Sequence, residues 1–129
     1  IYTELFVGSS DVYKRQALDD LGLGWFEMDL YDPAALARIR HALKTPVASC
    51  ESLFGLRGFR PFFESQSMDV AIVDVPWNGI WQAMKIAGLA ESFEVNVAPH
   101  NFYGHPFYFY ERPFLCSHPQ LPHHGNRHR

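Results

Sequence analysis

Four short apolar runs alternate with longer amphipathic stretches between Gly24 and His100, and this alternation limits the folds that the chain can adopt. Short runs rich in Val, Ile and Phe are typical of buried strands, and each stretch between them is long enough for a helix. The predicted strands are GWFEMDL, PVASCES, MDVAIVDV and FEVNVAPHN, the last of which is expected to stop at Pro99. Because such strands favour a parallel sheet covered by helices, the sequence predicts an α/β fold of about four consecutive parallel units.

The segment DPAALARIRHALKT carries the clearest helix signals in the chain. Asp32 is suited to cap the helix, and Pro33 fits the first helical position. Apolar residues recur at helical spacing at Leu36, Ile39 and Leu43. Two further helices are predicted in GLRGFRPFFESQS, where Gly58 and Pro61 weaken the prediction, and in GIWQAMKIAGLAES.

Each predicted strand ends in a polar residue that is able to do chemistry. These residues are Glu27, Glu51, Asp74 and His100, and their separations of 24, 23 and 26 residues correspond to one strand–helix unit each. The carboxyl ends of all strands meet at one face of a parallel barrel, which is the face that carries the active site. We therefore expect the four side chains to converge.

The glutamate pair and the pair of Asp74 and His100 suggest different roles. Glu27 and Glu51 supply hard oxygen ligands of the kind that Mg²⁺ prefers, although either acid alone is also suited to a helix cap or a surface ion pair. Asp74 is able to accept the ring N–H of His100, which fixes the tautomer and leaves the other nitrogen as a base. The remaining histidines are interpreted as structural or surface residues; they are His41, His105, His118, His123, His124 and His128.

Composition limits the possible partners and location. The chain has 129 residues, of which 47% are hydrophobic and 16% aromatic, enough for one globular core. A net charge of −3 and a pI near 6.1 argue against binding to nucleic-acid phosphates. Cys50 and Cys116 form no CxxC pair, which favours the reducing cytoplasm. No apolar run is long enough to span a membrane, so we predict a cytoplasmic protein without a membrane partner.

The segments WFEMD, ASCESLFG, MDVAIVDVPWNGI and VNVAPHNFYGH resemble the fourth to seventh barrel strands of the enolase superfamily, in its mandelate racemase and acid-sugar dehydratase branch. The resemblance covers roughly residues 18–105 and implies a partial (β/α)8 barrel. It implies that Glu27 and Glu51 are the second and third Mg²⁺ ligands and that Asp74 and His100 are the catalytic dyad. The implied reaction removes the proton α to a substrate carboxylate and passes through an enediolate, whose charge Mg²⁺ offsets.

The resemblance also implies a substrate and exposes departures from the family pattern. The implied substrate is a small sugar acid, an aldonate or aldarate, and the implied parent enzyme is a homo-oligomer. Trp77, Asn78 and Asn101 are candidates for contacts with the substrate, although VPWNG stands where many relatives have a lysine and paired glycines. The family's first metal ligand, its lysine base region and its capping α+β domain precede the position of Glu27 and are missing from this chain.

The two ends of the chain do not fit the barrel pattern. DVYKRQ looks like one reading frame of a transposase-end adapter, so residues 1–16 are predicted to be a non-native leader and residues 17–105 the barrel domain. The tail is aromatic and then His-rich, without strand–helix order. Codons for this tail, read one nucleotide later, permit LSTFMSAHFCAAIPNFRIMEID, which contains the helix and acid-ended strand of an eighth unit. Residues 106–129 are therefore predicted to be a frameshifted, irregular tail.

Three classes of function fit this sequence. The first is a Mg²⁺-dependent dehydratase of sugar acids, with a racemase or epimerase of the same branch as the nearest alternative. The second is a relative that binds a carboxylate without catalysis, and the third is an aromatic and His-rich interaction module in the tail. Because part of a barrel exposes sheet edges and apolar helix faces, we expect the chain itself to be poorly soluble and inactive.

Overall fold

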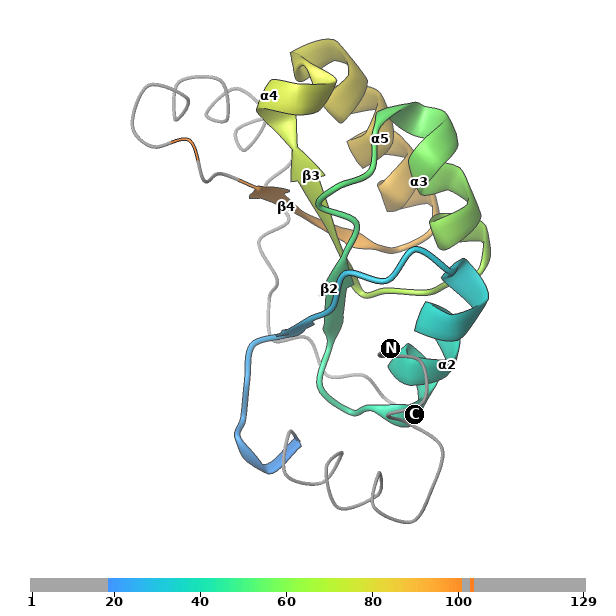
Figure 1. Ribbon diagram of the computed structural model, residues 1–129, viewed down its shortest axis with the longest axis vertical. Coiled ribbons are helices and arrows are strands. Elements are labelled where there is room, and N and C mark those ends of the chain that lie inside the picture. The colour runs from blue at the N-terminus through green and yellow to red at the C-terminus, as the bar shows by residue number, and fades with distance from the viewer. Residues whose placement is uncertain (1–18, 101–102, 104–129) are drawn as a thin grey trace.

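A computed structural model describes residues 19–100 and residue 103, and the chain trace and its elements are shown in Figure 1. Strands and helices alternate along these residues, as predicted. In chain order the elements are β1 (Phe26–Glu27), α2 (Pro33–Ala42), β2 (Val47–Ser49), α3 (Gly55–Glu64), β3 (Val70–Asp74), α4 (Val75–Asn78), α5 (Ile80–Ser92) and β4 (Asn96–His100).

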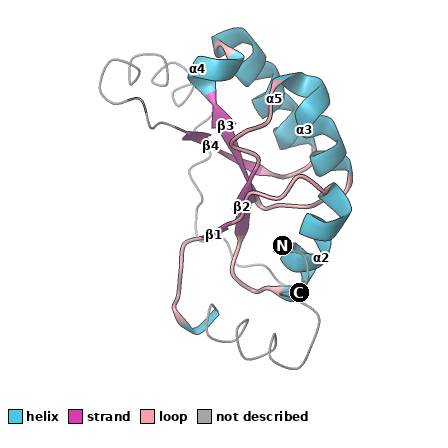
Figure 2. Ribbon diagram, in the orientation of Figure 1, coloured by secondary structure: helices cyan, strands magenta, loops and turns pink. Residues whose placement is uncertain are grey.

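The four strands form one sheet in the order β1-β2-β3-β4, and every neighbouring pair is parallel. Each strand is therefore followed by a helical connection to the next strand in the sheet, which is the arrangement of consecutive units in a (β/α)8 barrel. The helices α2, α3 and α5 lie along one side of the sheet (Figure 2). The predicted parallel α/β fold is confirmed.

The two faces of the sheet have different neighbours. In β3, Ala71 and Val73 belong to the main core under the helices, whereas Val70 and Ile72 belong to a smaller cluster on the opposite face. Side chains alternate between faces along a strand. Asp74, two residues after Ile72, therefore projects from the face opposite the helices, which would be the interior of a closed barrel.

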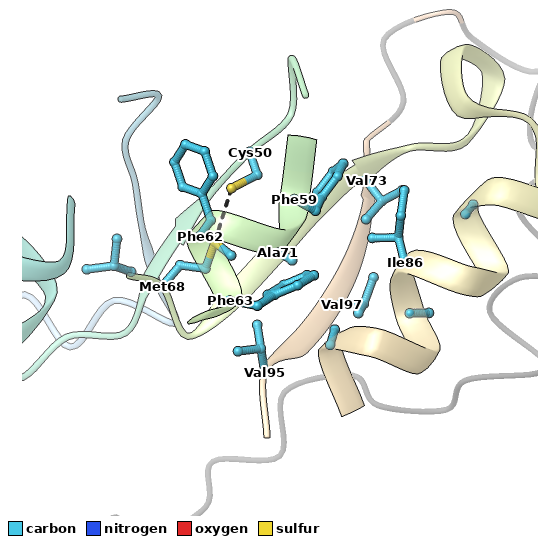
Figure 3. Packing of buried hydrophobic residues seen from close by; sticks show 14 of the residues in the cluster. Cys50, Phe59, Phe62, Phe63, Met68, Ala71, Val73, Ile86, Val95 and Val97 are labelled. Carbon is cyan, nitrogen blue, oxygen red and sulfur yellow. Dashed lines mark hydrogen bonds between the residues drawn. The ribbon is translucent and has the colours of Figure 1, made fainter. Parts of the chain in front are cut away.

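The main core holds the helices against the sheet (Figure 3). Phe59 and Phe63 of α3 are fully buried, and their ring centroids lie 6.0 Å apart. They pack in the same cluster as Ile86 of α5 and as Val73 and Val97 of the sheet. Burying a side chain of this size contributes about 1.5–3 kcal/mol, so these contacts fix the strand ends relative to each other.

Acidic side chains also hold the amino ends of two strands. Asp69, just before β3, forms an ion pair with Arg40 at 2.8 Å and accepts the N–H of Val47 at 2.9 Å. Asp19 accepts the backbone N–H groups of Lys44 and Thr45 at 3.1 and 2.8 Å, and the Thr45 hydroxyl at 2.9 Å. The entries to β2 and β3 are therefore fixed by carboxylates whose donors come from neighbouring segments.

The predicted helix start at Asp32 is confirmed, because its side chain accepts the N–H groups of Ala34 and Ala35 and Pro33 is the first helical residue. The helix ends earlier than predicted, at Ala42. The strand β1 covers only Phe26 and Glu27 and is therefore shorter than the predicted GWFEMDL strand.

Two further differences concern β4 and α4. The last strand was predicted to stop at Pro99, and this is wrong, because β4 continues to His100 in register with Asp74. An edge strand accepts a proline when the missing N–H faces away from its neighbour, and among the described residues β4 pairs only with β3. The short helix α4 was not predicted, since it begins directly after β3 and is too short to show helical periodicity.

Within the described part of the chain, none of the helices has the length and apolar character needed to cross a bilayer.

Candidate functional site

Asp74 and His100 form the centre of the site at the carboxyl ends of β3 and β4. The two residues are register partners, and His100 Nδ1 lies 3.0 Å from Asp74 Oδ2. The Asp74 side chain is 2% exposed and that of His100 is 24% exposed, so the carboxylate is enclosed while the imidazole reaches solvent. A buried carboxylate beside one ring nitrogen favours the tautomer with a proton on Nδ1, which leaves Nε2 as the acceptor.

Asp74 receives two further hydrogen bonds. The backbone N–H of Trp77 donates to Oδ1 at 2.8 Å, so Asp74 also caps the amino end of α4. The hydroxyl of Tyr103 donates to Oδ2 at 3.1 Å. This set of donors fixes the position of the buried carboxylate beside His100.

Glu51 reaches the site from a turn that follows β2. Cys50 has a φ of 86°, in the left-handed region that is unusual for a residue with a side chain, and its carbonyl accepts the N–H of Leu53 at 3.1 Å. This turn carries Glu51 to His100, where Glu51 Oε2 lies 3.4 Å from Nε2. The imidazole of His100 therefore lies between Asp74 on one side and Glu51 on the other.

Glu27 completes the group from the end of β1. It is in register with Ala48, which faces the side of the sheet opposite the helices. The pKa of Glu27 is raised, first by burial and then by the negative charge of Glu51 and a hydrogen bond with it. His100 and a hydrogen bond from the Trp25 side chain act in the opposite direction. The two glutamates are thus close enough for the charge of Glu51 to oppose the ionisation of Glu27.

All four predicted strand-end residues therefore converge. Glu27 and Glu51 form a carboxylate pair, and a bound divalent cation would offset the repulsion that, after burial, raises the pKa of Glu27. Glu27 and Glu51 supply two oxygen ligands of the type that Mg²⁺ prefers. Within residues 19–100 and 103, however, no group of three or more His, Cys, Asp or Glu side chains is arranged to hold a metal ion. The donor set fits part of a Mg²⁺ site.

The three predicted substrate contacts lie in different surroundings. Asn78 is buried, and its amide accepts the N–H of Gly55 at 2.7 Å and donates to the carbonyls of Leu53 and Asp74 at 3.3 and 2.9 Å. These bonds tie the loop after Glu51 to the end of β3. Trp77 is 56% exposed at the first turn of α4, beside Asp74. Asn101 lies outside the described residues, as do the predicted leader and tail.

Sequence reasoning did not assign a role to Tyr103 or to the backbone of Cys50. Tyr103 lies in the segment VNVAPHNFYGH, three residues after His100, but an aromatic residue at that spacing gives no signal of a hydrogen bond to Asp74. The buried thiol of Cys50 donates to Met68 Sδ at 3.1 Å, and burial raises its pKa to about 12. This thiol stays protonated and is not suited to act as a nucleophile.

Comparison with known proteins identifies the family of this chain. A family model described as enolase C-terminal domain-like matches residues 11–126. A protein of Caldivirga maquilingensis assigned as an L-rhamnonate dehydratase is 37% identical over 106 residues, which cover 74% of this chain and 26% of that protein.

Two solved structures show how the fold compares. A Burkholderia xenovorans protein assigned as an L-alanine-DL-glutamate epimerase is 47% identical, with a TM-score of 0.80 over 85% of this chain and 28% of that one. The same protein has been solved with bound magnesium and fumarate. An L-talarate dehydratase of Polaromonas sp. JS666, in complex with Mg and L-glucarate, is 28% identical, with a TM-score of 0.64 over 69% of this chain and 26% of that one. The chain thus spans about a quarter of the length of these relatives.

Proposed function

Because the chain belongs to the enolase C-terminal domain-like family, we propose that it is part of a Mg²⁺-dependent enzyme that removes the proton α to the carboxylate of a sugar acid. The observation that carries the proposal is the position of His100, whose two ring nitrogens face Asp74 at 3.0 Å and Glu51 at 3.4 Å. We propose a dehydratase, and relatives of this chain include proteins assigned as dehydratases.

His100 is the proposed base. Its Nε2 would take the α proton, while Asp74 holds the proton on Nδ1 and stabilises the imidazolium that forms. The enclosed carboxylate of Asp74 favours this division, because its hydrogen bonds hold it in place beside Nδ1. In a dehydratase the same imidazolium would then protonate the β-hydroxyl as it leaves.

Glu27 and Glu51 would hold the metal ion. When bound, Mg²⁺ would neutralise negative charge that develops on the substrate carboxylate. Glu51 also lies 3.4 Å from His100 Nε2, so the base and the carboxylate pair face the same space. A substrate bound in this space would therefore lie within reach of the imidazole.

Deuterium exchange at the α carbon tests the proposal. A version of the protein that contains the segments present in the relatives is incubated with aldonates and aldarates in D₂O and Mg²⁺, and α-deuterium is measured by NMR. We expect exchange in the unchanged protein and its loss on His100→Asn. The matched control is His41→Asn, since the His41 ring contacts only its own helix at the Ala37 carbonyl in the contacts that the structure gives. Exchange that survives His100→Asn equally would contradict the proposal.

The same experiment separates the alternatives. A racemase or epimerase would give exchange with inversion at the α carbon and no loss of water. The similarity to the assigned epimerase from Burkholderia supports this alternative. A non-catalytic carboxylate binder would bind the acid without exchange. Deletion of residues 106–129 tests the interaction module, because a genuine module would lose its partner. We also propose a cytoplasmic location, which cell fractionation tests. The proposed homo-oligomeric state of the parent enzyme is tested by size-exclusion chromatography.

The extent of the natural sequence is a separate proposal. We infer that residues 1–16 are a leader, residues 17–105 the barrel domain and residues 106–129 a frameshifted tail, and that this chain alone turns over no substrate. The support is the composition of the two ends, together with the quarter of a relative's length that the chain spans. Sequencing independent DNA clones tests the ends: an unbroken frame through the printed tail would contradict the frameshift.

A further inference from the structure

The carboxylate of Asp74 is held at both of its oxygen atoms. Oδ1 accepts the backbone N–H of Trp77 at 2.8 Å, and Oδ2 accepts the hydroxyl of Tyr103 at 3.1 Å in addition to His100 Nδ1 at 3.0 Å. The side chain is 2% exposed, so water has little access to replace any of these donors. Tyr103 is therefore the only side chain besides His100 that the hydrogen bonds of the described residues bring to this carboxylate.

A carboxylate needs more than one anchor to keep its orientation. The torsion that rotates an aspartate carboxylate is broad and has no sharp minimum. The N–H of Trp77 fixes Oδ1 but leaves Oδ2 free to pivot around it. A second donor on Oδ2 removes this freedom and keeps Oδ2 directed at His100 Nδ1.

Tyr103 is suited to remain a donor. The pKa of its phenol is raised, first by burial and then by the hydrogen bond to Asp74 and the negative charge of that carboxylate, while a hydrogen bond with the Trp77 side chain acts in the opposite direction. The phenol therefore keeps its proton at neutral pH. Trp77 supports the carboxylate twice, directly through its backbone N–H and indirectly through its side chain and Tyr103.

We propose that Tyr103 is a positioning residue that holds the Asp74 carboxylate in the orientation from which it fixes the His100 tautomer. The proposal rests on the proposed function, in which His100 Nε2 is the base. Tyr103 does not contact the substrate in this account; it acts through Asp74. Without its hydroxyl, Oδ2 moves away from Nδ1 for part of the time, and both neutral tautomers of His100 are then populated.

The test measures the tautomer directly and does not require turnover. The 129-residue chain is labelled with ¹⁵N-histidine and studied by NMR at an alkaline pH where imidazoles are neutral, and His100→Asn identifies the His100 signals. In the unchanged chain we expect the proton on Nδ1. In Tyr103→Phe we expect a mixture of tautomers and about ten-fold faster exchange of the Nδ1 proton with water, consistent with the loss of one hydrogen bond to a charged group.

Tyr31→Phe is the matched control, because the Tyr31 hydroxyl also contacts an aspartate, Asp29 at 2.8 Å, together with Ser52 at 2.7 Å, and neither contact involves Asp74 or His100. It should leave the tautomer and the exchange rate of His100 unchanged. A Tyr103→Phe chain that keeps the Nδ1 tautomer and its exchange rate would overturn the proposal. A proton on Nε2 in the unchanged chain would instead overturn the dyad of the proposed function, so the two failures are distinguishable.

Trp77→Phe gives a second test in case Tyr103→Phe does not fold. This change keeps the backbone N–H on Asp74 Oδ1 and removes only the side-chain hydrogen bond to Tyr103. We expect a smaller acceleration of Nδ1 proton exchange than the ten-fold effect, with the Nδ1 tautomer still in excess. An exchange rate equal to that of the unchanged chain would count against a role for the Trp77–Tyr103 pair.

Discussion

The two ends of the sheet use acidic side chains in opposite ways. At the amino end, Asp19 and Asp69 each accept several hydrogen bonds, and Asp69 also pairs with Arg40. At the carboxyl end, Glu27 and Glu51 lie beside each other, and the pKa of Glu27 is raised by burial and by the charge of Glu51. Acidic side chains thus fix strands at one end and concentrate negative charge at the other.

The pKa values of Asp19 and Glu27 are shifted in opposite directions. Burial disfavours the ionised form of Asp19, but hydrogen bonds from Thr45 and Lys44 outweigh it and lower the pKa of this carboxyl. The pKa of Glu27 is raised by burial and by Glu51. Carboxylates with lowered pKa values stabilise a fold, whereas a close pair with a raised pKa is typical of a site that binds or reacts. The acids at the amino end thus support the fold, whereas the carboxylate pair at the carboxyl end belongs to the candidate site.

Removal of the ion pair at the amino end should have the largest effect. Asp69→Ala leaves Arg40 without its partner and the N–H of Val47 without its acceptor in a region where Asp69 is 6% exposed. We expect a loss of about 3–5 kcal/mol in the free energy of unfolding, measured with urea.

The matched control is an acid in an exposed ion pair. Glu64→Ala removes the contact of Glu64 with Arg60, and both side chains are at least half exposed. This change should alter the unfolding free energy by less than about 1 kcal/mol. Equal losses for the two variants would contradict the special role of the amino end.

Neutralising the carboxyl-end pair should not weaken the fold. Glu27→Gln removes a carboxyl group whose ionisation is opposed by burial and by Glu51 and keeps the shape of the side chain, so the free energy of unfolding should stay the same or rise slightly. The same urea titration, without divalent cations, measures the effect. A large loss of stability would mean that the pair is structural, as the residues at the amino end are.

The pH dependence of stability should carry opposite signs at the two ends. Because the folded-state pKa of Asp19 is lowered from 3.8, its contribution is present above that value and is lost as the pH falls through the folded pKa. The folded-state pKa of Glu27 is raised from 4.5. The folded state therefore loses stability as the pH rises from 4.5 through the raised pKa of Glu27.

Urea unfolding at pH values from about 3 to 7 measures both effects through the slope of stability with pH. Asp19→Asn should reduce the loss of stability in acid, and Glu27→Gln should make stability rise more steeply with pH. Changes of the same sign in the two variants would contradict the comparison.

The thiol of Cys50 should give the smallest effect, because it takes no part at either end. With its pKa raised to about 12 and its side chain buried, it should not react with a thiol reagent near pH 8 while the chain is folded. The absorbance of the coloured product that the reagent releases measures the reaction of Cys50 in a Cys116→Ser variant. The urea-unfolded chain is the positive control. Rapid reaction in the folded state would show that the turn before Glu51 opens.

The sequence predicted the elements more completely than their contacts. Spacing alone identified Glu27, Glu51, Asp74 and His100, because parallel strands bring one residue per unit to a common end and the structure places all four there. The helix start at Asp32 could be predicted because a helix cap is a local interaction.

What the sequence did not reveal depends on contacts between distant segments. The amide of Asn78 binds the loop before Gly55, 23 residues away, and no local pattern marks that bond. The hydroxyl of Tyr103 meets Asp74 from 29 residues away. The ion pair of Arg40 with Asp69 likewise joins a helix to the start of a strand. Such pairings are set by how the units pack and not by periodicity.

Magnesium-dependent stability tests the central claim, that the carboxyl end holds a cation between Glu27 and Glu51, most directly. Urea unfolding of the 129-residue chain is measured near pH 8 with and without Mg²⁺, for the unchanged chain, Glu51→Gln and the control Glu64→Gln. We predict that Mg²⁺ stabilises the unchanged chain and the control, by about 1.4 kcal/mol at ten times the dissociation constant, and leaves Glu51→Gln unchanged. Equal stabilisation of all three chains, or of none, would contradict the account.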